Sequence, residues 1–429
     1  MAAEVDQNDS TTRFFRGRWL NLLILVLSVA LVFGLLRLAD ILVAPWIKPP
    51  VLSDAMEILF PPNSEHEFAT PEFRYVSKTN RFGVRDRDFS QLPEPGVYRI
   101  IAIGDSYTYG WGVNVEDRWT THLEKRLRDL GYNVEVLTFA KPGVGPPFYA
   151  ELAEKIIPLF RPNLVLVCLL QGNDLASAGG ETRFHFSDYV RDLLSPYFPH
   201  LVLMSQRWLR PEGEGVINPV SPLQKSTAED NRRWASIAAK NLYDGWDAEK
   251  KAKFEQLEPF VRERFFNGDL NPYLIDLALN NPRFYFVALN MEDDWTRTCI
   301  HRMGVHLRKI RTVARLYGSD VVALSIPEGV FVNVAAWRNI QRVGYEAVPE
   351  MLVSLGPEST IRRAAEMAGL PNFHATQAFR AQREDASLYF ELDGHLTPRG
   401  HALYAEAITP LLAEWMAQQG VPRQNLNNP

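Results

Sequence analysis

Three short apolar runs separated by helical segments constrain the fold of this chain more than any other feature of its sequence. The third run, LVLVCLL at residues 164–170, is apolar at every position, which is typical of a strand covered on both faces of a parallel sheet. The earlier runs lie at 98–103 and 134–139, and helical periodicity follows them at 119–131 and 146–160. The alternation predicts an α/β domain in three layers, with helices on both faces of a parallel sheet.

The alternation stops after the third run and resumes only near residue 300. The intervening segment is far longer than an ordinary loop, so we interpret it as an insertion. It is expected to be mostly helical and to form a lid or a substrate-binding subdomain, with a structural decoration or an oligomer contact as the alternative. The predicted parts are a linker and N-terminal appendage at 44–96, a split catalytic domain at 97–175 and 300–418, the insertion at 176–299 and a disordered tail at 419–429.

Two local patterns in these regions lead to specific expectations. Within the insertion, residues 248–266 place charges on one side and large apolar residues on the other, which predicts an amphipathic helix. Near the C-terminus, the run LYFEL at 388–392 predicts a short strand.

The N-terminus carries an uncharged apolar stretch at 19–36 that continues into a further apolar run. A bilayer core requires about 20 apolar residues in a helix, so this stretch is just long enough to span one. Three arginines precede it within residues 13–18, which predicts a cytoplasmic segment at 1–18, a transmembrane signal anchor at 19–43 and an extracytoplasmic remainder. A cleaved signal peptide and a buried core helix are the alternatives, but no small-x-small cleavage site follows the stretch.

Composition excludes several classes of protein. The net charge is −5 and no long basic block is present, so nucleic acid is not an expected partner. The two cysteines, Cys168 and Cys299, do not form a disulfide scaffold, and Cys168 lies within an apolar strand where it is expected to be a small buried hydrophobe. No paired Cys or His residues have metal-ligand spacing, and the sequence carries no signal for an oligomeric state.

Polar and glycine residues follow each predicted strand, at the edge where open α/β sheets bind their ligands. Ser106 follows the first strand and is a candidate nucleophile whose own backbone N–H can serve as a hydrogen-bond donor. After the second strand, Gly143 or Gly145 can present an unobstructed backbone N–H. After the third strand, Asn173 can donate from its side-chain amide. Acyl transfer needs such donors for the developing oxyanion.

A base for Ser106 is found near the C-terminus, in the sequence DGHLTPRGH. His395 is the candidate base, and Asp393 is the candidate residue that orients its imidazole. Glu391 or a backbone carbonyl could orient His395 instead. The alternative for Ser106 itself is a helix cap without any catalytic role.

Four short blocks, GDSY, KPGVG, GND and DGH, occur in this order, and with them the chain resembles the SGNH (GDSL) hydrolases. The resemblance implies a flavodoxin-like three-layer α/β/α fold. It also implies that Ser106 is the nucleophile, that Ser106, Gly143 and Asn173 form the oxyanion hole, and that His395 is the base with Asp393 as its partner. No metal or organic cofactor is implied.

The resemblance covers roughly residues 98–175 and 305–415, with one departure. The commonest family pattern has two residues between the aspartate and the histidine, whereas here only Gly394 separates them. This Asp-x-His spacing is similar to that in polysaccharide O-acetyltransferase relatives of the fold, such as the alginate acetyltransferases.

Taken together, these features predict a membrane-anchored, extracytoplasmic serine esterase that cleaves carboxylic esters, acetyl esters among them, through an acyl-serine intermediate. An O-acyltransferase that modifies an envelope or exported polysaccharide is the first alternative. An anchored carbohydrate-binding protein without activity is the second. The expected substrate is an ester of a carbohydrate or a lipid, and the membrane is the other expected partner.

Overall fold

The computed structural model describes residues 6–47, 52, 56–179, 186–209 and 225–423. The chain forms two compact units. One consists of Met1–Pro49 with Phe186–Val216, and the other of Pro50–His185 with Ile217–Pro429. Of the predicted disordered tail, residues 424–429 lie outside the described residues, whereas Arg423 pairs with Tyr132 in an antiparallel bridge.

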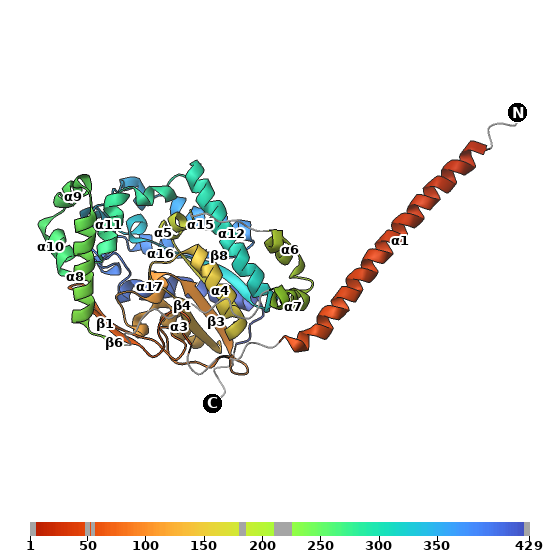
Figure 1. Cartoon of the computed structure of the whole chain (residues 1–429), viewed down its shortest axis with the longest axis horizontal. Coiled ribbons are helices and arrows are strands. Elements are labelled where there is room, and N and C mark those ends of the chain that lie inside the picture. Colours follow the sequence, from red (N-terminus) through yellow and green to blue (C-terminus); the bar gives the residue numbers. More distant parts are fainter. Residues whose placement is uncertain (1–5, 48–51, 53–55, 180–185, 210–224, 424–429) are drawn as a thin grey trace. The chain divides into compact units, whose positions relative to one another are not determined.

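The larger unit contains a parallel sheet of five strands (Figure 1). Its spatial order is β4-β3-β5-β7-β8, so numbered along the chain the strands run 2-1-3-4-5, which is the flavodoxin-like order. The predicted fold class is therefore confirmed. The strands are β3 (Tyr98–Gly104), β4 (Val134–Ala140), β5 (Leu164–Leu170), β7 (Asp320–Ile326) and β8 (Asn372–His374).

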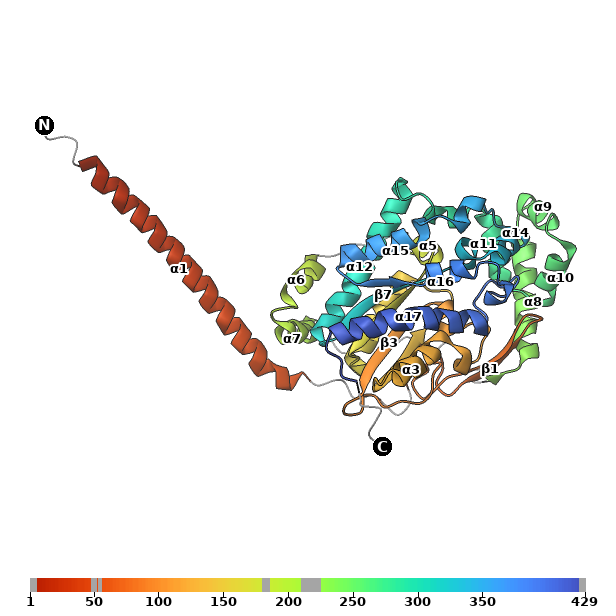
Figure 2. The same cartoon turned by 180° about the vertical axis from the view of Figure 1, so that it is seen from behind.

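Helices cover both faces of this sheet. On one face α12 (Asp294–Leu316) packs against α4 (Pro146–Phe160) and α15 (Gly356–Ala368). On the other face α17 (Pro398–Gln418) packs against α3 (Trp119–Asp129). Figure 1 is viewed with α4 in front of the sheet, and Figure 2 shows the opposite face with α17 and α3 in front.

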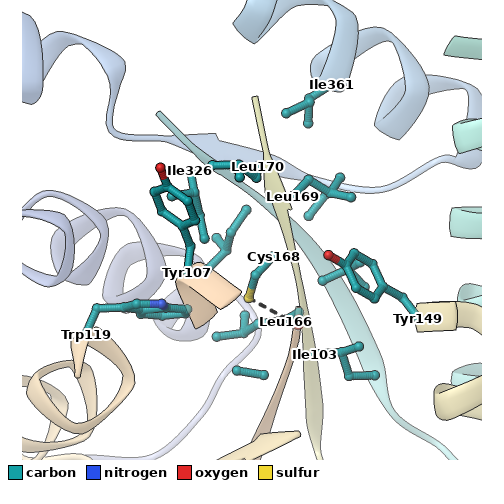
Figure 3. Close-up of a cluster of buried hydrophobic side chains, with 14 of the residues drawn as sticks. Ile103, Tyr107, Trp119, Tyr149, Leu166, Cys168, Leu169, Leu170, Ile326 and Ile361 are labelled. Carbon is teal, nitrogen blue, oxygen red and sulfur yellow. Dashed lines mark hydrogen bonds between the residues drawn. The ribbon is translucent and has the colours of Figure 1, made fainter. Parts of the chain in front are cut away.

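The centre of the core is β5, in which all seven residues are buried. Figure 3 shows Tyr149 on one side of this strand and Trp119 and Tyr107 on the other, with Cys168 between them. Cys168 is a free, buried cysteine, as expected for a small hydrophobic residue in a strand covered on both faces. Full burial of a large apolar side chain contributes about 1.5–3 kcal/mol, so this strand alone is a major source of stability.

The predicted N-terminal appendage forms a small separate sheet. Strands β1 (Glu65–Ala69) and β2 (Arg74–Lys78) pair antiparallel, and β6 (Lys225–Ser226) adds a parallel edge to β1. The short helix α2 (Ser106–Tyr109) and the loop after it lie against this appendage through Arg85.

Arg85 is almost fully buried and joins the appendage to the loop after α2. Its guanidinium donates hydrogen bonds to the carbonyls of Tyr109 (2.6 Å), Gly110 (3.1 Å) and Val113 (2.6 Å). It also stacks on the rings of Tyr75 and Tyr109. Because a planar guanidinium offers several donors in a rigid array, one side chain fixes the whole turn.

The insertion after β5 is helical and contributes to both units. In the larger unit it forms α8 (Ala228–Gly245), α9 (Ala248–Glu255), α10 (Pro259–Asn267) and α11 (Pro272–Asn280). The amphipathic helix expected over 248–266 is two helices, because Pro259 lacks the N–H that would continue the first one and instead begins the second.

The smaller unit contains α1 (Asp6–Val43), α6 (Phe186–Leu194) and α7 (Pro199–Leu209). Residues Trp19–Trp46 have a mean hydropathy of 2.7 and are mostly exposed, so this helix is long and apolar enough to cross a membrane, although a signal sequence meets the same criteria. Near the end of α1, the buried carboxylate of Asp40 accepts hydrogen bonds from the backbone N–H of Leu201 (2.8 Å) and from Arg37 (3.1 Å).

Replacing Arg85 tests whether it stabilises the fold. Because Arg85→Met leaves the buried carbonyls of Tyr109, Gly110 and Val113 without their charged donor, we expect the free energy of unfolding to fall by about 2–4 kcal/mol. Chemical denaturation of the full chain in detergent measures this change. The matched control is Arg74→Met, whose exposed side chain pairs only loosely with Glu67, and which should change stability by no more than about 0.5 kcal/mol. Equal losses in both variants would contradict the role of Arg85.

Candidate active site

A cavity of about 410 Å³ opens at the carboxyl ends of the sheet strands. Its lining includes Ser106 after β3, Gly143 after β4, Asn173 after β5 and Glu328 after β7, together with His395 from the loop before α17. The chain leaves β3 and β5 in opposite directions along the sheet, so these two neighbouring strands form the topological switch point where such folds bind ligands.

Ser106 is the first residue of α2, directly after the end of β3. Asp105 caps this helix, accepting a hydrogen bond from the backbone N–H of Tyr107 at 3.0 Å. Gly104 is required for the tight turn, because a Cβ there would lie 2.3 Å from the hydroxyl of Thr108. The Ser106 hydroxyl is thereby presented at the start of a helix, where its own backbone N–H has no partner within the helix.

The imidazole of His395 lies between Ser106 and Asp393. Its Nε2 is 2.7 Å from the Oγ of Ser106, and its Nδ1 is 2.6 Å from the Oδ1 of Asp393. A carboxylate only accepts hydrogen bonds, so Nδ1 carries the proton and Nε2 is left to accept from the serine hydroxyl. The three side chains therefore form one directed chain of hydrogen bonds ending at Ser106.

The electrostatic environment of His395 favours its protonated form. Burial alone would lower the pKa of His395, but the charge of Asp393 and its hydrogen bond to the imidazole outweigh this effect, and the charge of Asp105 acts in the same direction. The pKa of His395 therefore lies above its ordinary value. A base with this shift takes up a proton from Ser106 more readily than a free imidazole would.

The single residue between Asp393 and His395 is accommodated by a turn. Gly394 has a φ of +81°, in the left-handed region that glycine adopts without strain, and this conformation returns the Asp393 carboxylate to the imidazole. The hydroxyl of Tyr107 donates to the carbonyl of Gly394 at 2.8 Å and holds the turn on the sheet side. The strand expected over 388–392 is absent, and the backbone there belongs to this turn, in which Phe390 N–H donates to the carbonyl of His395.

Trp111 after α2 and Glu72 from the appendage also hold Asp393. The indole N–H of Trp111 donates to the Oδ2 of Asp393 at 3.2 Å. The carboxylate of Glu72 accepts from the backbone N–H groups of Leu392 and Asp393, and is itself paired with Arg264 at 2.9 Å. Sequence reasoning did not identify Glu72 as a site residue, nor the contact between Trp111 and Asp393.

Glu391, the alternative partner, lies at the rim of the cavity and does not contact the imidazole. Its carboxylate pairs with Arg342, which also pairs with Glu258. The structure thus places Asp393, and not Glu391, beside His395.

The two glycines after β4 have different surroundings. Gly143 lines the cavity with a φ of +75°, and a Cβ there would meet nothing within 4 Å, so its backbone is open on the cavity side. Gly145 caps α4 outside the cavity, and a Cβ there would lie 2.7 Å from Ser177. Gly143 is therefore the glycine that can present its N–H to a ligand.

Asn173 begins α5 (Asn173–Ser177) and is the third potential donor. Within the part of the chain that the structure describes, its side-chain amide makes no hydrogen bond and is free to donate into the cavity. The loop is fixed by Asp174, whose carboxyl group contacts the backbone N–H of Leu170 (2.9 Å) and the hydroxyl of Tyr149 (3.1 Å). Burial, followed by the nearby charge of Asp105, raises the pKa of Asp174 well above its ordinary value.

The far wall of the cavity carries a polar pair that sequence reasoning missed. Glu328 follows β7 and accepts a hydrogen bond from the hydroxyl of Tyr285 at 3.0 Å, while its other oxygen is buried without a partner among the described residues. Burial raises the pKa of Glu328 to about 8, so the group is mostly neutral at pH 7. Its position at a strand end was a signal that could have identified it. The remaining walls are mainly apolar and include Leu274, Leu277, Val330, Ile340 and Tyr345.

Among the described residues, no group of three or more His, Cys, Asp or Glu side chains is arranged to hold a metal ion. The polar groups in the cavity lining include the hydroxyl of Ser106, the imidazole of His395, the carboxylate of Asp393 and the side-chain amide of Asn173.

No protein-family model and no curated protein matches the chain. Solved structures similar to it include the esterase EstA from Pseudoalteromonas sp., at 7% identity and a TM-score of 0.34, covering 75% of this chain and 99% of that chain. A GDSL-like lipase from Bacteroides thetaiotaomicron matches at 11% identity and a TM-score of 0.32, covering 76% of this chain and 93% of that chain. A mutant of an acetylxylan esterase from Geobacillus stearothermophilus matches at 10% identity and a TM-score of 0.34, covering 77% of this chain and 97% of that chain. At these values the function has to be argued from the chain's own residues.

The pH dependence of Ser106 reactivity tests the hydrogen-bonded chain. A fluorophosphonate probe should label Ser106 at a rate that rises with pH through the raised pKa of His395, because only the neutral imidazole accepts the serine proton. Asp393→Asn removes the charge that raises this pKa, so the rise should move to lower pH and the rate should fall by about 10³–10⁴-fold. Glu391→Gln is the control and should change neither. A Glu391→Gln variant that reproduced the effect would contradict the assignment of Asp393.

Proposed function

We propose that this protein is a serine esterase that hydrolyses carboxylic esters through an acyl-serine intermediate. The observation that carries the proposal is the continuous chain from Asp393 through His395 to the hydroxyl of Ser106, with distances of 2.6 Å and 2.7 Å. The geometry matches the roles that define catalytic triads on unrelated folds.

The reaction follows from this arrangement. The Oγ of Ser106 attacks the ester carbonyl carbon while its proton passes to Nε2 of His395, and Asp393 stabilises the resulting imidazolium. The tetrahedral intermediate collapses as His395 gives the proton to the leaving alcohol oxygen, which leaves an acyl group on Ser106. Water then attacks the acyl carbon, His395 takes a proton from it and returns one to Ser106, and the carboxylic acid is released.

The negative oxygen of each tetrahedral intermediate requires donors that are already in place. The backbone N–H groups of Ser106 and Gly143 and the side-chain amide of Asn173 are proposed for this role, because all three residues line the cavity that holds the serine hydroxyl. Loss of one such donor typically costs 10²–10³ in kcat.

The acyl group is proposed to be short, with acetyl as the expected example. The polar groups in the cavity lining are the reason, because Glu328 and Tyr285 lie there as a hydrogen-bonded pair. A long alkyl chain laid against such groups would cover them without offering a hydrogen bond, which is unfavourable.

An O-acyltransferase is the second candidate. A further cavity adjoins the active site beside Asp393, so a sugar hydroxyl has space to approach the acyl-serine in place of water. Both reactions use the same residues, and the product distinguishes them: free acid for the esterase, or an acylated sugar when an oligosaccharide is supplied.

The aryl ester 4-nitrophenyl acetate tests the proposed activity with the full chain in detergent. We expect release of nitrophenol by the wild type and a loss of at least 10³-fold in kcat/KM for Ser106→Ala, since the nucleophile is removed. The octanoyl ester should be a poorer substrate than the acetyl ester. The control Ser359→Ala, on the distant helix α15, should keep wild-type activity. Wild-type turnover by Ser106→Ala would show that Ser106 is not the nucleophile.

We also propose that α1 anchors the protein with the catalytic unit outside the cytoplasm, because three arginines precede the apolar segment. A reporter that is active only outside the cytoplasm should be active when fused after Pro50 and inactive when fused after Arg18. An inactive Pro50 fusion would reverse the proposed orientation. Loss of the apolar segment from an active fusion, seen as a shorter product, would identify a cleaved signal peptide instead.

A further inference from the structure

A second cavity of about 460 Å³ adjoins the active-site cavity. The two cavities share Trp111, Asn271, Tyr273 and Asp393 in their linings, so they adjoin at the residue proposed to orient the catalytic histidine. The other walls of the second cavity come from β1 and the turn after this strand, from α8 and from the loop between α10 and α11. The volume lies within the range of small-molecule binding sites.

Aromatic side chains dominate one wall of the second cavity. Trp234 on α8 is 45% exposed and Tyr273 on α11 is 64% exposed, although both are large hydrophobic residues. Trp111 lies between the two cavities and is held by Phe68 and Phe73, with ring centroids at 5.4 Å and 6.3 Å. The cavity therefore presents flat aromatic faces, one of which is fixed by packing.

Polar side chains surround these faces and are held in place. Arg232 pairs with Asp269 at 2.8 Å, and Asn231 donates to the carbonyl of Glu67 and to the hydroxyl of Ser226. Asn271 caps α11 by accepting from the backbone N–H of Tyr273. These ordered donors and acceptors require no rearrangement to meet a polar ligand, which reduces the entropy cost of binding.

The proposed mechanism determines which part of a substrate enters this cavity. The acyl group stays on Ser106, and the alcohol oxygen receives its proton from Nε2 of His395. The alcohol portion therefore leaves on the side of His395, and Asp393 beside it lines the second cavity. This step rests on the proposed esterase function.

We propose that the second cavity binds the sugar units of a carbohydrate ester, next to the esterified unit at Ser106. A sugar ring presents C–H groups on its faces and hydroxyl groups at its edge, which suits exposed aromatic rings flanked by Asn, Arg and Asp side chains. A fatty-alcohol chain would instead cover the Arg232–Asp269 pair without offering a polar group, and burying polar groups in this way is unfavourable. The protein is thus specific for acylated oligosaccharides or polysaccharides.

The test compares substrates of different length with the full chain in detergent. O-acetylated hexasaccharides of xylose, glucose and mannuronic acid are each compared with the matching acetylated monosaccharide, and 4-nitrophenyl acetate reports basal activity. We expect at least one hexasaccharide to be hydrolysed with a kcat/KM about tenfold above its monosaccharide. Trp234→Ala should abolish this gain and leave the kcat/KM for 4-nitrophenyl acetate within twofold, because Trp234 does not line the active-site cavity.

The matched control is Trp295→Ala, an exposed tryptophan that lines neither cavity and should preserve the gain. If the wild type hydrolyses 4-nitrophenyl acetate but no hexasaccharide has a higher kcat/KM than its monosaccharide, the carbohydrate subsite is wrong while the esterase function stands. A higher kcat/KM for dodecyl acetate than for ethyl acetate, lost in Trp234→Ala, would show that the second cavity binds lipid and not carbohydrate. Loss of aryl ester activity in the wild type would instead reject the esterase function on which the inference rests.

Discussion

The hydrogen bond between His395 and Ser106 joins two positions that are 289 residues apart in the chain, and the site exists only where this contact forms. Ser106 is held by the end of β3 and the cap from Asp105, whereas His395 is held by the turn before α17. The two are brought together because α17 packs against α3 on one face of the sheet and Tyr107 bonds to the carbonyl of Gly394. The site is therefore complete only when the sheet and its covering helices are folded.

Because only one residue separates Asp393 from His395, other parts of the structure have to hold the Asp393 carboxylate in its orientation, and the appendage contributes to this. A turn at Gly394 returns the carboxylate to the imidazole, but a turn alone does not fix the orientation of a carboxylate. Trp111 and Glu72 supply this constraint, and Arg85 in turn fixes the loop that carries Trp111. The N-terminal appendage thus supports the proposed catalytic machinery.

The parts of the fold that could be predicted from sequence are those with strong periodicity. The apolar run of β5 and the alternation around it predicted the parallel sheet, and the rule that ligands lie at strand ends pointed to Ser106 and Asn173. β8 has only three residues, too few for a periodic signal, and the apolar run near residue 390 is a turn because its backbone bonds to His395. Glu72 and the contact of Trp111 with Asp393 were not predicted, because both depend on a residue about three hundred positions further on.

Charge is distributed unequally around Ser106, and this asymmetry suits the proposed reaction. The carboxylate of Asp393 lies behind His395, where it favours the imidazolium that forms as the serine proton is transferred. In the cavity lining, burial raises the pKa of Glu328 to about 8, so this group favours the neutral form at pH 7. Burial also raises the pKa of Asp174 well above its ordinary value. A negatively charged carboxylate there would repel the oxyanion that Asn173 and Gly143 are proposed to bind. The same burial that shapes the cavity therefore favours the neutral form of Glu328, which lines it.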